Sequence, residues 1–326
     1  MRQPAGGKHA KPMNAKGSII AAIHMNRRRL IASLPAFLAA PALSAPVEGR
    51  LRVAVIGHTG RGNYGHDLDK MWLGIPAVEI AAVADADAAG LAGALRKLKV
   101  TQGFADYRQM LSKIGPDIVA IGPRHIDQHR DMLLTAIKFG AKGIYIEKPF
   151  VRSPQEADEV IRAAQETGVK IAIAHRNRYH PVLPVVSGLI KDGTLGRVLE
   201  MRARGKEDPR GGSLDLWVLG SHLFNLATVF GGPPVSCSAT VLQAGEPVTK
   251  ADVQDGAEGI GPLAGNEVHA RFEMTAGLPL FRDSVQNAGE RDAGFGLQVI
   301  GTRGIIDFRI DQEPLAHFCQ GRPFNP

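Results

Sequence analysis

The stretch LRVAVIGHTGRGNYG, residues 51–65, decides the fold of this chain. Its first six residues form a short, mostly apolar run, which is typical of a central strand in a parallel sheet. Four glycines follow, and their missing side chains let a pyrophosphate reach the backbone amides at the start of a helix. We therefore expect a buried strand, a glycine-rich turn and a helix, the beginning of a dinucleotide-binding unit.

A carboxylate follows at the distance that such a unit needs. Residues 78–83 form a second apolar run, and Asp85 comes just after it, 28 residues after Gly57. A carboxylate there accepts hydrogen bonds from a ribose diol and repels a 2′-phosphate, which favours NAD over NADP. The alternative is a glycine-rich surface turn followed by an ordinary aspartate. The residues expected around the cofactor in this segment are Gly57, His58, Thr59, Gly60, Arg61, Gly62 and Asp85.

Strands and helices then alternate along the chain. The sequence predicts helices at 86–98, 104–111 and 153–167 and buried strands at 117–122, 143–146 and 169–174. This order is typical of an α/β fold with a doubly wound parallel sheet of the Rossmann type, whose ligands bind beyond the carboxyl ends of the strands. Pro123, Glu147 and Lys148 follow two of those strands, so we expect them at the cofactor site. We place this domain at residues 50–175.

The pattern changes after residue 175, where strands follow one another with few helices between them. This favours a C-terminal α+β domain, residues 176–326, with a mixed or antiparallel sheet. The expected helix covers 221–230, and the expected strands cover 198–203, 235–242, 267–274, 278–285, 296–300 and 304–310.

The first 45 residues are predicted to be a leader. Arg27-Arg28-Arg29 precedes an apolar run at 30–40 and small residues suited to cleavage, as in a twin-arginine signal. The run is too short to span a bilayer, so no membrane span is expected in the mature protein. We expect a periplasmic or otherwise exported protein, with Met25 as a second candidate for the start. The alternative is a cytoplasmic protein with a basic tail.

The net charge of +7 does not indicate nucleic-acid binding. The leader carries seven basic and no acidic residues, so the rest of the chain holds 32 of each. A neutral body without a basic stripe argues against binding to phosphate backbones. The two cysteines, Cys237 and Cys319, build neither a disulfide framework nor a zinc site, and His125 and His129 have no evident third ligand. No metal is therefore expected.

Several short motifs give the chain a family resemblance by their order and spacing. From residue 51 to residue 310 it resembles the Gfo/Idh/MocA family of sugar and polyol oxidoreductases. The matching features are the glycines at 60 and 62, Asp85, Asp106-Tyr107-Arg108, Glu147-Lys148-Pro149, Arg178-Tyr179, Gly220-Ser221-His222 and Gly301-Thr302-Arg303-Gly304. The resemblance implies NAD as cofactor and a homo-oligomer.

The resemblance also implies a reaction. Lys148 and His222 match the family positions that face the nicotinamide and the substrate hydroxyl. A histidine can accept the hydroxyl proton near neutral pH while hydride leaves for the cofactor, and an ammonium stabilises the developing alkoxide. We therefore expect an NAD-dependent oxidoreductase acting on a CH–OH group of a sugar or polyol. The expected substrate contacts are Arg178, Asp215 and Asn225.

Two departures from the family pattern concern the proton relay. The family often has an aspartate four residues before the histidine, where this chain has Val218, with Asp215 the nearest carboxylate. The residue three after the histidine is commonly acidic in the family and is Asn225 here. These departures keep two alternatives open: an NAD-dependent glycoside hydrolase of the same fold, and a non-catalytic NAD-binding protein. The chain also ends soon after its last expected strand, which leaves open whether a terminal strand or helix of the family is present.

Overall fold

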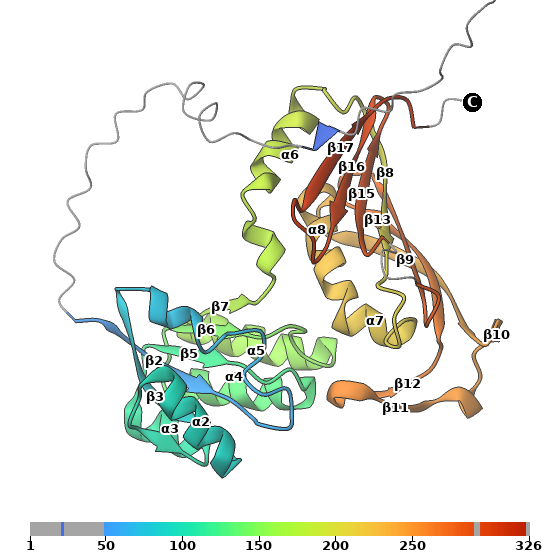
Figure 1. The fold of residues 1–326 in the computed structure, drawn as a ribbon. Coiled ribbons are helices and arrows are strands. Elements are labelled where there is room, and N and C mark those ends of the chain that lie inside the picture. The colour runs from blue at the N-terminus through green and yellow to red at the C-terminus, as the bar shows by residue number, and fades with distance from the viewer. Residues whose placement is uncertain (1–20, 23–48, 290–293, 324–326) are drawn as a thin grey trace, which may run out of the picture.

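The structure, a computed structural model, describes residues 21–22, 49–289 and 294–323. Almost all of the expected leader lies outside these residues. Within them, two large sheets stand side by side, one all-parallel and one mixed, as Figure 1 shows. This arrangement confirms the predicted fold class.

The parallel sheet has the strand order of a Rossmann fold. Its six described strands run in the spatial order β4-β3-β2-β5-β6-β7, so the chain reverses direction across the sheet between β2 and β5. In such sheets, ligands bind at this reversal, beyond the carboxyl ends of the strands. The strands are β2 (Leu51–Ile56), β3 (Val78–Ala84), β4 (Gly103–Phe104), β5 (Ile118–Ile121), β6 (Gly143–Ile146) and β7 (Lys170–Ile173).

Apolar side chains on both faces of β2 explain why the sheet is covered twice. Ala54 and Ile56 pack with one buried cluster, which includes residues of α3 (Tyr107–Ile114), α4 (His129–Lys138) and α5 (Pro154–Thr167). Val53 and Val55 pack with a second cluster, to which α2 (Ala88–Leu98) contributes. This two-sided burial is the reason that the strand sequence shows no polar alternation.

The helix that we expected directly after the glycine-rich turn is absent from the structure. The described segment between β2 and β3 forms turns and one 3-10 helix, η1 (Met71–Gly74). Asn63, Gly65 and Asp67 have φ of 54°, 62° and 64°, and left-handed residues at this spacing interrupt a right-handed helix. Tyr64 and Trp72 cover the sheet in its place. The turn therefore has no helix N-terminus behind it.

The second sheet is mixed, as predicted. Its spatial order is β1-β17-β16-β15-β8-β14-β13-β9-β10 among the described residues, and only the β8–β14 pair in it is parallel. The strands are β1 (Ala21–Ala22), β8 (Val198–Arg204), β9 (Pro234–Gln243), β10 (Glu246–Pro247), β13 (Glu267–Met274), β14 (Pro279–Val285), β15 (Gly296–Gly301), β16 (Gly304–Arg309) and β17 (Ala316–Gln320). We did not predict β17, whose sequence AHFCQ has little β-branched character.

Among the described residues, three α-helices belong to this half of the chain. The predicted helix is present as α8 (Gly220–Gly231), and its apolar face packs on the sheet through Leu223 and Leu226. The sequence analysis missed α6 (Val182–Lys191) and α7 (Ser213–Val218). Because α7 runs almost directly into α8, the two helices together present the first turn of α8 toward the parallel sheet.

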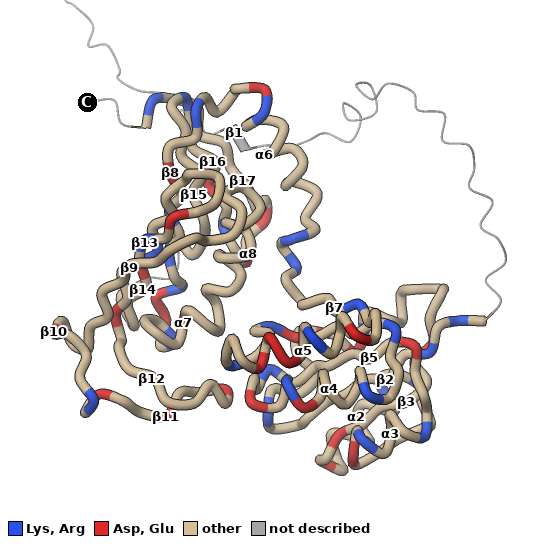
Figure 2. Tube along the Cα trace, turned by 180° about the vertical axis from the view of Figure 1, so that it is seen from behind, with Lys and Arg blue, Asp and Glu red and all other residues tan. Residues whose placement is uncertain are grey.

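A segment of the second half reaches back to the parallel sheet. We call residues 250–263 the arm; it contains η4 (Lys250–Asp252), β11 (Gln254–Gly256), η5 (Ala257–Gly259) and β12 (Gly261–Leu263). η5 contacts η2 (Ile126–Gln128), the short helix after β5. Figures 1 and 2 show from opposite sides that the arm leaves the mixed sheet and extends toward the parallel-sheet domain.

Candidate functional site

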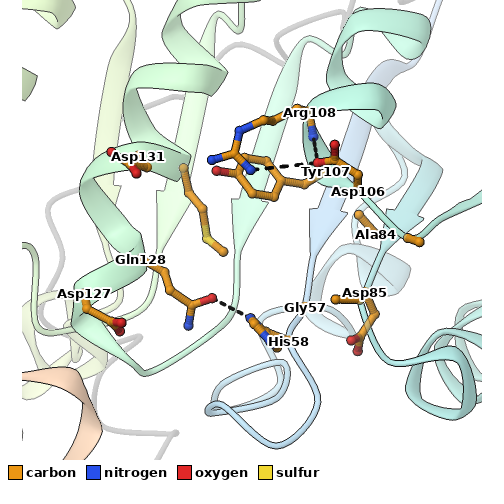
Figure 3. Close-up of a pocket in the computed structure, with 13 residues that line it drawn as sticks. Gly57, His58, Ala84, Asp85, Asp106, Tyr107, Arg108, Asp127, Gln128 and Asp131 are labelled. Carbon is orange, nitrogen blue, oxygen red and sulfur yellow. Dashed lines mark hydrogen bonds and ion pairs between the residues drawn. The ribbon is translucent and has the colours of Figure 1, made fainter.

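A first pocket lies at the reversal point of the parallel sheet. It has a volume of about 330 Å³, and Figure 3 shows its walls, which come from the ends of β2 and β3 and the starts of α3 and α4. Its lining residues include Gly57, His58, Asp85, Asp106, Tyr107, Arg108, Asp127, Gln128 and Asp131. The Arg108 guanidinium stacks over the Tyr107 ring, 4.5 Å from its centroid.

Two glycines allow the turn between β2 and η1 to pack as closely as it does. A Cβ at Gly57 would lie 2.2 Å from the Tyr64 ring, and a Cβ at Gly62 would lie 2.2 Å from the backbone nitrogen of Arg124. Gly62 also has φ +90°, which residues with a side chain rarely adopt. Gly60 has a similar φ of +82° but open space around it. The sequence-predicted glycines therefore serve the packing of the turn itself.

Asp85 holds this turn in place. Its side chain is 1 % exposed and accepts hydrogen bonds from Thr59 N at 3.1 Å, Thr59 Oγ1 at 2.7 Å and Asp87 N at 3.0 Å. Both carboxylate oxygens are thus engaged within the protein. We expected Asp85 to receive the ribose diol. In the structure Asp85 does line the pocket, and its carboxylate oxygens accept hydrogen bonds from Thr59 of the glycine-rich turn and from Asp87.

Polar atoms at the pocket wall fit a ribose or phosphate ligand. Arg61 pairs with Asp127 at 2.6 Å, and His58 Nδ1 lies 2.5 Å from Gln128 Oε1. These contacts leave Gln128 Nε2 and Asp127 Oδ1 buried without a partner among the described residues. Buried donors and acceptors are normally satisfied, so the Gln128 donor is what a bound hydroxyl or phosphate oxygen would engage, and the Asp127 acceptor is what a ribose hydroxyl would engage. The residues present therefore fit the adenosine side of a dinucleotide.

The second pocket lies between the two halves of the chain and has a volume of about 630 Å³. Gly65 and His66 of the glycine-rich segment line it, so this segment contributes to both pockets. We call it the cleft. Its other lining residues are Asp67, Leu68, Arg124, Tyr145, Glu147, Lys148, Ala174, Arg176, Lys206, Arg210, Leu219, His222, Glu258, Phe295 and Asp311.

Lys148 and His222, which are 74 positions apart in the sequence, both line this cleft. Lys148 follows β6 and is 5 % exposed, and its Nζ donates a hydrogen bond to the carbonyl oxygen of Val218 at 2.9 Å. Burial lowers the pKa of this ammonium, and the charges of Glu147 and Glu258 oppose the shift. Lys148 is therefore a fixed donor at the floor of the cleft.

His222 lies in the first turn of α8 and is largely buried. Burial, the Lys148 charge and His175 lower its pKa to about 3. The His175 ring packs edge-on against it with centroids 5.9 Å apart, and burial lowers the pKa of His175 to about 4. His222 is thus an uncharged imidazole at neutral pH, and its buried Nδ1 is left without a partner in the described part of the chain.

The structure corrects the expectation that Asp215 contacts substrate or orients His222. Asp215 is fully buried, where it pairs with Arg282 and accepts a 2.8 Å hydrogen bond from Ser284 Oγ. The Val218 side chain points into the apolar core. No hydrogen bond between described residues joins a carboxylate to His222.

The other two expected substrate contacts also lie outside the cleft lining. Arg178 is exposed on η3 (Arg176–Tyr179), and its neighbour Arg176 lines the cleft instead. Asn225 lies one turn of α8 beyond His222 and has a buried, unpaired Oδ1. Sequence order alone does not tell which residue of a short helical turn faces a ligand.

Glu147, Pro123 and His129 have structural contacts around the cofactor side. Glu147 is 1 % exposed, and its Oε1 lies 2.5 Å from His66 Nδ1. The ring nitrogens of the buried His129 lie 2.7 Å from Pro123 O and 2.8 Å from Pro149 O, which ties together the two loops after β5 and β6. Among the described residues no cluster of His, Cys, Asp and Glu could hold a metal ion.

Sequence reasoning did not assign a role to several cleft residues. The cleft residue Arg176, like its neighbour His175, which packs against His222, belongs to a polar cluster at a strand end, which was the one available signal. The others come from loops without a recognisable pattern: His66, Arg124, Lys206, Arg210, Glu258 and Asp311.

Fold and site together define a two-domain dinucleotide-binding protein with a lysine–histidine cleft. Residues 51–175 match the family model described as an oxidoreductase family with an NAD-binding Rossmann fold. The NAD-binding domain therefore belongs to the Gfo/Idh/MocA oxidoreductase family, as the motifs predicted. The prediction of NAD as the cofactor is confirmed at this level.

Curated relatives match part of the chain. D-apiose dehydrogenase of Paraburkholderia graminis is 27% identical over 42% of this chain and 36% of its own length. The scyllo-inositol 2-dehydrogenase (NAD⁺) of Bacillus subtilis is 27% identical over 46% of this chain and 43% of its own length. The chain thus aligns with less than half the length of these two relatives.

Solved structures match more of the chain and show the fold. Levoglucosan dehydrogenase in complex with NADH and levoglucosan aligns with a TM-score of 0.64 at 20% identity, covering 84% of this chain and 80% of its own. An NAD-binding oxidoreductase from Klebsiella pneumoniae aligns with a TM-score of 0.61 at 22% identity, covering 80% and 73%. Within the described part of the chain, no helix is long and apolar enough to cross a membrane.

Proposed function

We propose that this protein is an NAD-dependent oxidoreductase that moves hydride between a secondary hydroxyl carbon of a sugar or polyol and the nicotinamide. The observation that carries the proposal is geometric: the buried Lys148, held by the Val218 carbonyl, and His222 from the other half of the chain line the same cleft. The chemistry of the relatives supports the substrate class, since they include dehydrogenases of apiose and of inositol.

The two residues divide the work on the substrate hydroxyl. Bound NAD⁺ supplies the hydride acceptor. His222 takes the hydroxyl proton as the C–H bond breaks, and the carbon becomes a carbonyl. Lys148, held by the Val218 carbonyl, stabilises the negative charge that develops on the oxygen during this transfer. In the reverse direction the imidazolium returns the proton, so atoms and charges balance both ways.

A product assay tests the proposal and separates it from its alternatives. The purified protein is incubated with NAD⁺ and a panel of sugars, polyols and aryl glycosides, and both NADH and released sugar are measured. The proposal predicts NADH in proportion to oxidised product. Free sugar without net NADH would instead indicate a glycoside hydrolase. Tight NAD binding with neither product would indicate a binding protein.

We also propose that copies of this chain associate through the mixed sheet. β9 is exposed along most of its length, and Val235 on it is 69 % exposed. A broad, solvent-exposed sheet face is a surface that the same face of a second copy can cover in a twofold-symmetric interface. Light scattering coupled to size-exclusion chromatography tests this: a mass of one chain at micromolar concentration would contradict it.

Export by the twin-arginine route is a further proposal, and it concerns residues outside the described part of the chain. Arg27-Arg28-Arg29 ahead of the apolar run 30–40 supports it. This route carries proteins that have already folded, which suits a cofactor-binding enzyme.

A further inference from the structure

The arm touches the cofactor-binding half of the molecule at one defined point. A Cβ on Gly259 would lie 2.4 Å from Asp127 Oδ1, and Gly259 has φ +73°. A glycine at this position therefore permits η5 to sit directly on η2. Because Asp127 also pairs with Arg61 of the glycine-rich turn, the arm abuts the wall of the first pocket.

Glu258, the residue before this contact, has an unusual backbone conformation. Its φ and ψ are 57° and 25°, the left-handed region that residues with a side chain seldom occupy. Such conformations persist where surrounding contacts impose them, and they concentrate at functional sites. The residue with this conformation, Glu258, lines the cleft together with Lys148 and His222.

Glu258 differs from the other carboxylates of the cleft in its contacts. Glu147 lies against His66, Asp311 pairs with Arg176 and Lys206, and Asp67 pairs with Lys70. No hydrogen bond or ion pair recorded between described residues uses the Glu258 carboxylate. Its charge nevertheless acts on the cleft: it opposes the lowering of the Lys148 pKa by burial, and it adds to the raising of the Arg210 pKa, which is mainly due to the hydrogen bond with Asp208.

We propose that Glu258 is a substrate-binding residue, whose carboxylate accepts hydrogen bonds from hydroxyl groups of the sugar or polyol beyond the reacting carbon. The inference rests on the proposed function. A carboxylate has two oxygens and can accept from two neighbouring hydroxyls at once, and such charge-assisted hydrogen bonds are stronger than neutral ones. The arm thus completes the cleft from the second domain, opposite Lys148.

The test compares Glu258→Gln with a matched control on the same arm, Asp255→Asn. Asp255 is an exposed carboxylate of β11 that does not line the cleft. For a polyol that the wild type oxidises, Glu258→Gln should lower kcat/KM by about 10- to 100-fold, mainly through KM. The KM for NAD⁺ should stay within about twofold of the wild type, and Asp255→Asn should match the wild type in both. Saturation-transfer NMR with the polyol and the NADH complex should show weaker binding to Glu258→Gln only.

Each other outcome contradicts the inference in a recognisable way. Wild-type kcat/KM in Glu258→Gln would remove Glu258 from substrate binding. If Glu258→Gln raised the KM for NAD⁺ as much as the KM for the polyol, the arm would instead be part of the cofactor site. A wild type without turnover on any sugar or polyol would contradict the proposed function itself and this inference with it. Thermal unfolding of each variant checks that it is folded. We expect Glu258→Gln to fold because glutamine has nearly the same shape as glutamate.

Discussion

The Lys148 ammonium donates a 2.9 Å hydrogen bond to the backbone carbonyl of Val218, and this bond crosses from the end of β6 to the end of α7. Its two residues belong to different halves of the chain. Val218 occupies the position where the family pattern often has an aspartate, yet its side chain is buried in the core and its carbonyl holds the lysine. The backbone carbonyl of residue 218 therefore positions Lys148, whereas its side chain contributes only to the apolar core.

Replacing this lysine should abolish turnover without loss of the cofactor. Lys148→Met keeps the length of the side chain but removes the ammonium, so the developing alkoxide loses its stabilising charge. We expect kcat to fall by about 100-fold or more, with NADH binding, measured by fluorescence, changed only slightly. Lys142→Met is the matched control because Lys142 is a surface lysine, 75 % exposed, at the start of the same strand. Equal kcat in Lys148→Met and Lys142→Met would contradict this role.

The two glycines of the turn should differ sharply in their tolerance of alanine. Gly60→Ala meets only the left-handed backbone cost, about 1–2 kcal/mol. Gly62→Ala adds a clash with the Arg124 backbone and should lower the unfolding free energy by about 2–5 kcal/mol. Urea unfolding of both variants measures this. Equal stability of the two would show that the turn relaxes freely around residue 62.

The buried histidines should make the protein less stable in mild acid. An unfolded histidine binds its proton at about pH 6.5. Folded His175 and His222 do so only at about 4 and about 3. Between these values the unfolded state binds more protons, so the unfolding free energy falls as the pH drops from 6.5 toward 4. His222→Gln should reduce this fall, as urea unfolding at pH 7 and pH 4.5 would show.

His269 provides a control of opposite sign for that experiment. Hydrogen bonds to Glu267 and Asp283 raise its pKa, so its proton binds more tightly in the folded protein and adds stability at low pH. His269→Gln should therefore steepen the loss of stability on acidification. If both variants changed the pH dependence of the unfolding free energy in the same direction, the direction of the pKa shift would be wrong for one of the two histidines.

Much of the fold could be predicted because local signals agreed with it. Ser153 caps α5 and Gly168 ends it in a left-handed conformation, which agrees with the helix predicted at 153–167. The prediction of a helix after the glycine-rich turn was wrong because Asn63, Gly65 and Asp67 take left-handed conformations there, and Tyr64 and Trp72 cover the sheet in place of the helix.

The candidate site was less predictable than the fold. Lys148 and His222 each belong to a recognisable motif, and both line the cleft; their catalytic roles stay a prediction. Asp215 was misplaced because its partner, Arg282, is 67 residues away and invisible to local reasoning. Glu258 was missed because it belongs to an irregular arm, and its direction is set by the contact of Gly259 with Asp127.

Export can be tested independently of the enzyme's chemistry. Replacing Arg27, Arg28 and Arg29 by lysine should leave the protein in the cytoplasm at full length, because the twin-arginine route requires arginine. Fractionation followed by mass spectrometry of the N-terminus measures both location and cleavage. A wild type that itself stays cytoplasmic and uncleaved would contradict the proposal.

The central claim, that His222 accepts the substrate proton during hydride transfer, has one direct measurement. It is the rate of NADH formation by His222→Ala in single turnover with saturating NAD⁺ and an oxidised polyol, compared with wild type and with His180→Ala, a histidine that does not line the cleft. Positioned proton transfer contributes about 100- to 10,000-fold in rate. We predict a loss in that range for His222→Ala and none for His180→Ala, whereas a wild-type rate in His222→Ala would contradict the account.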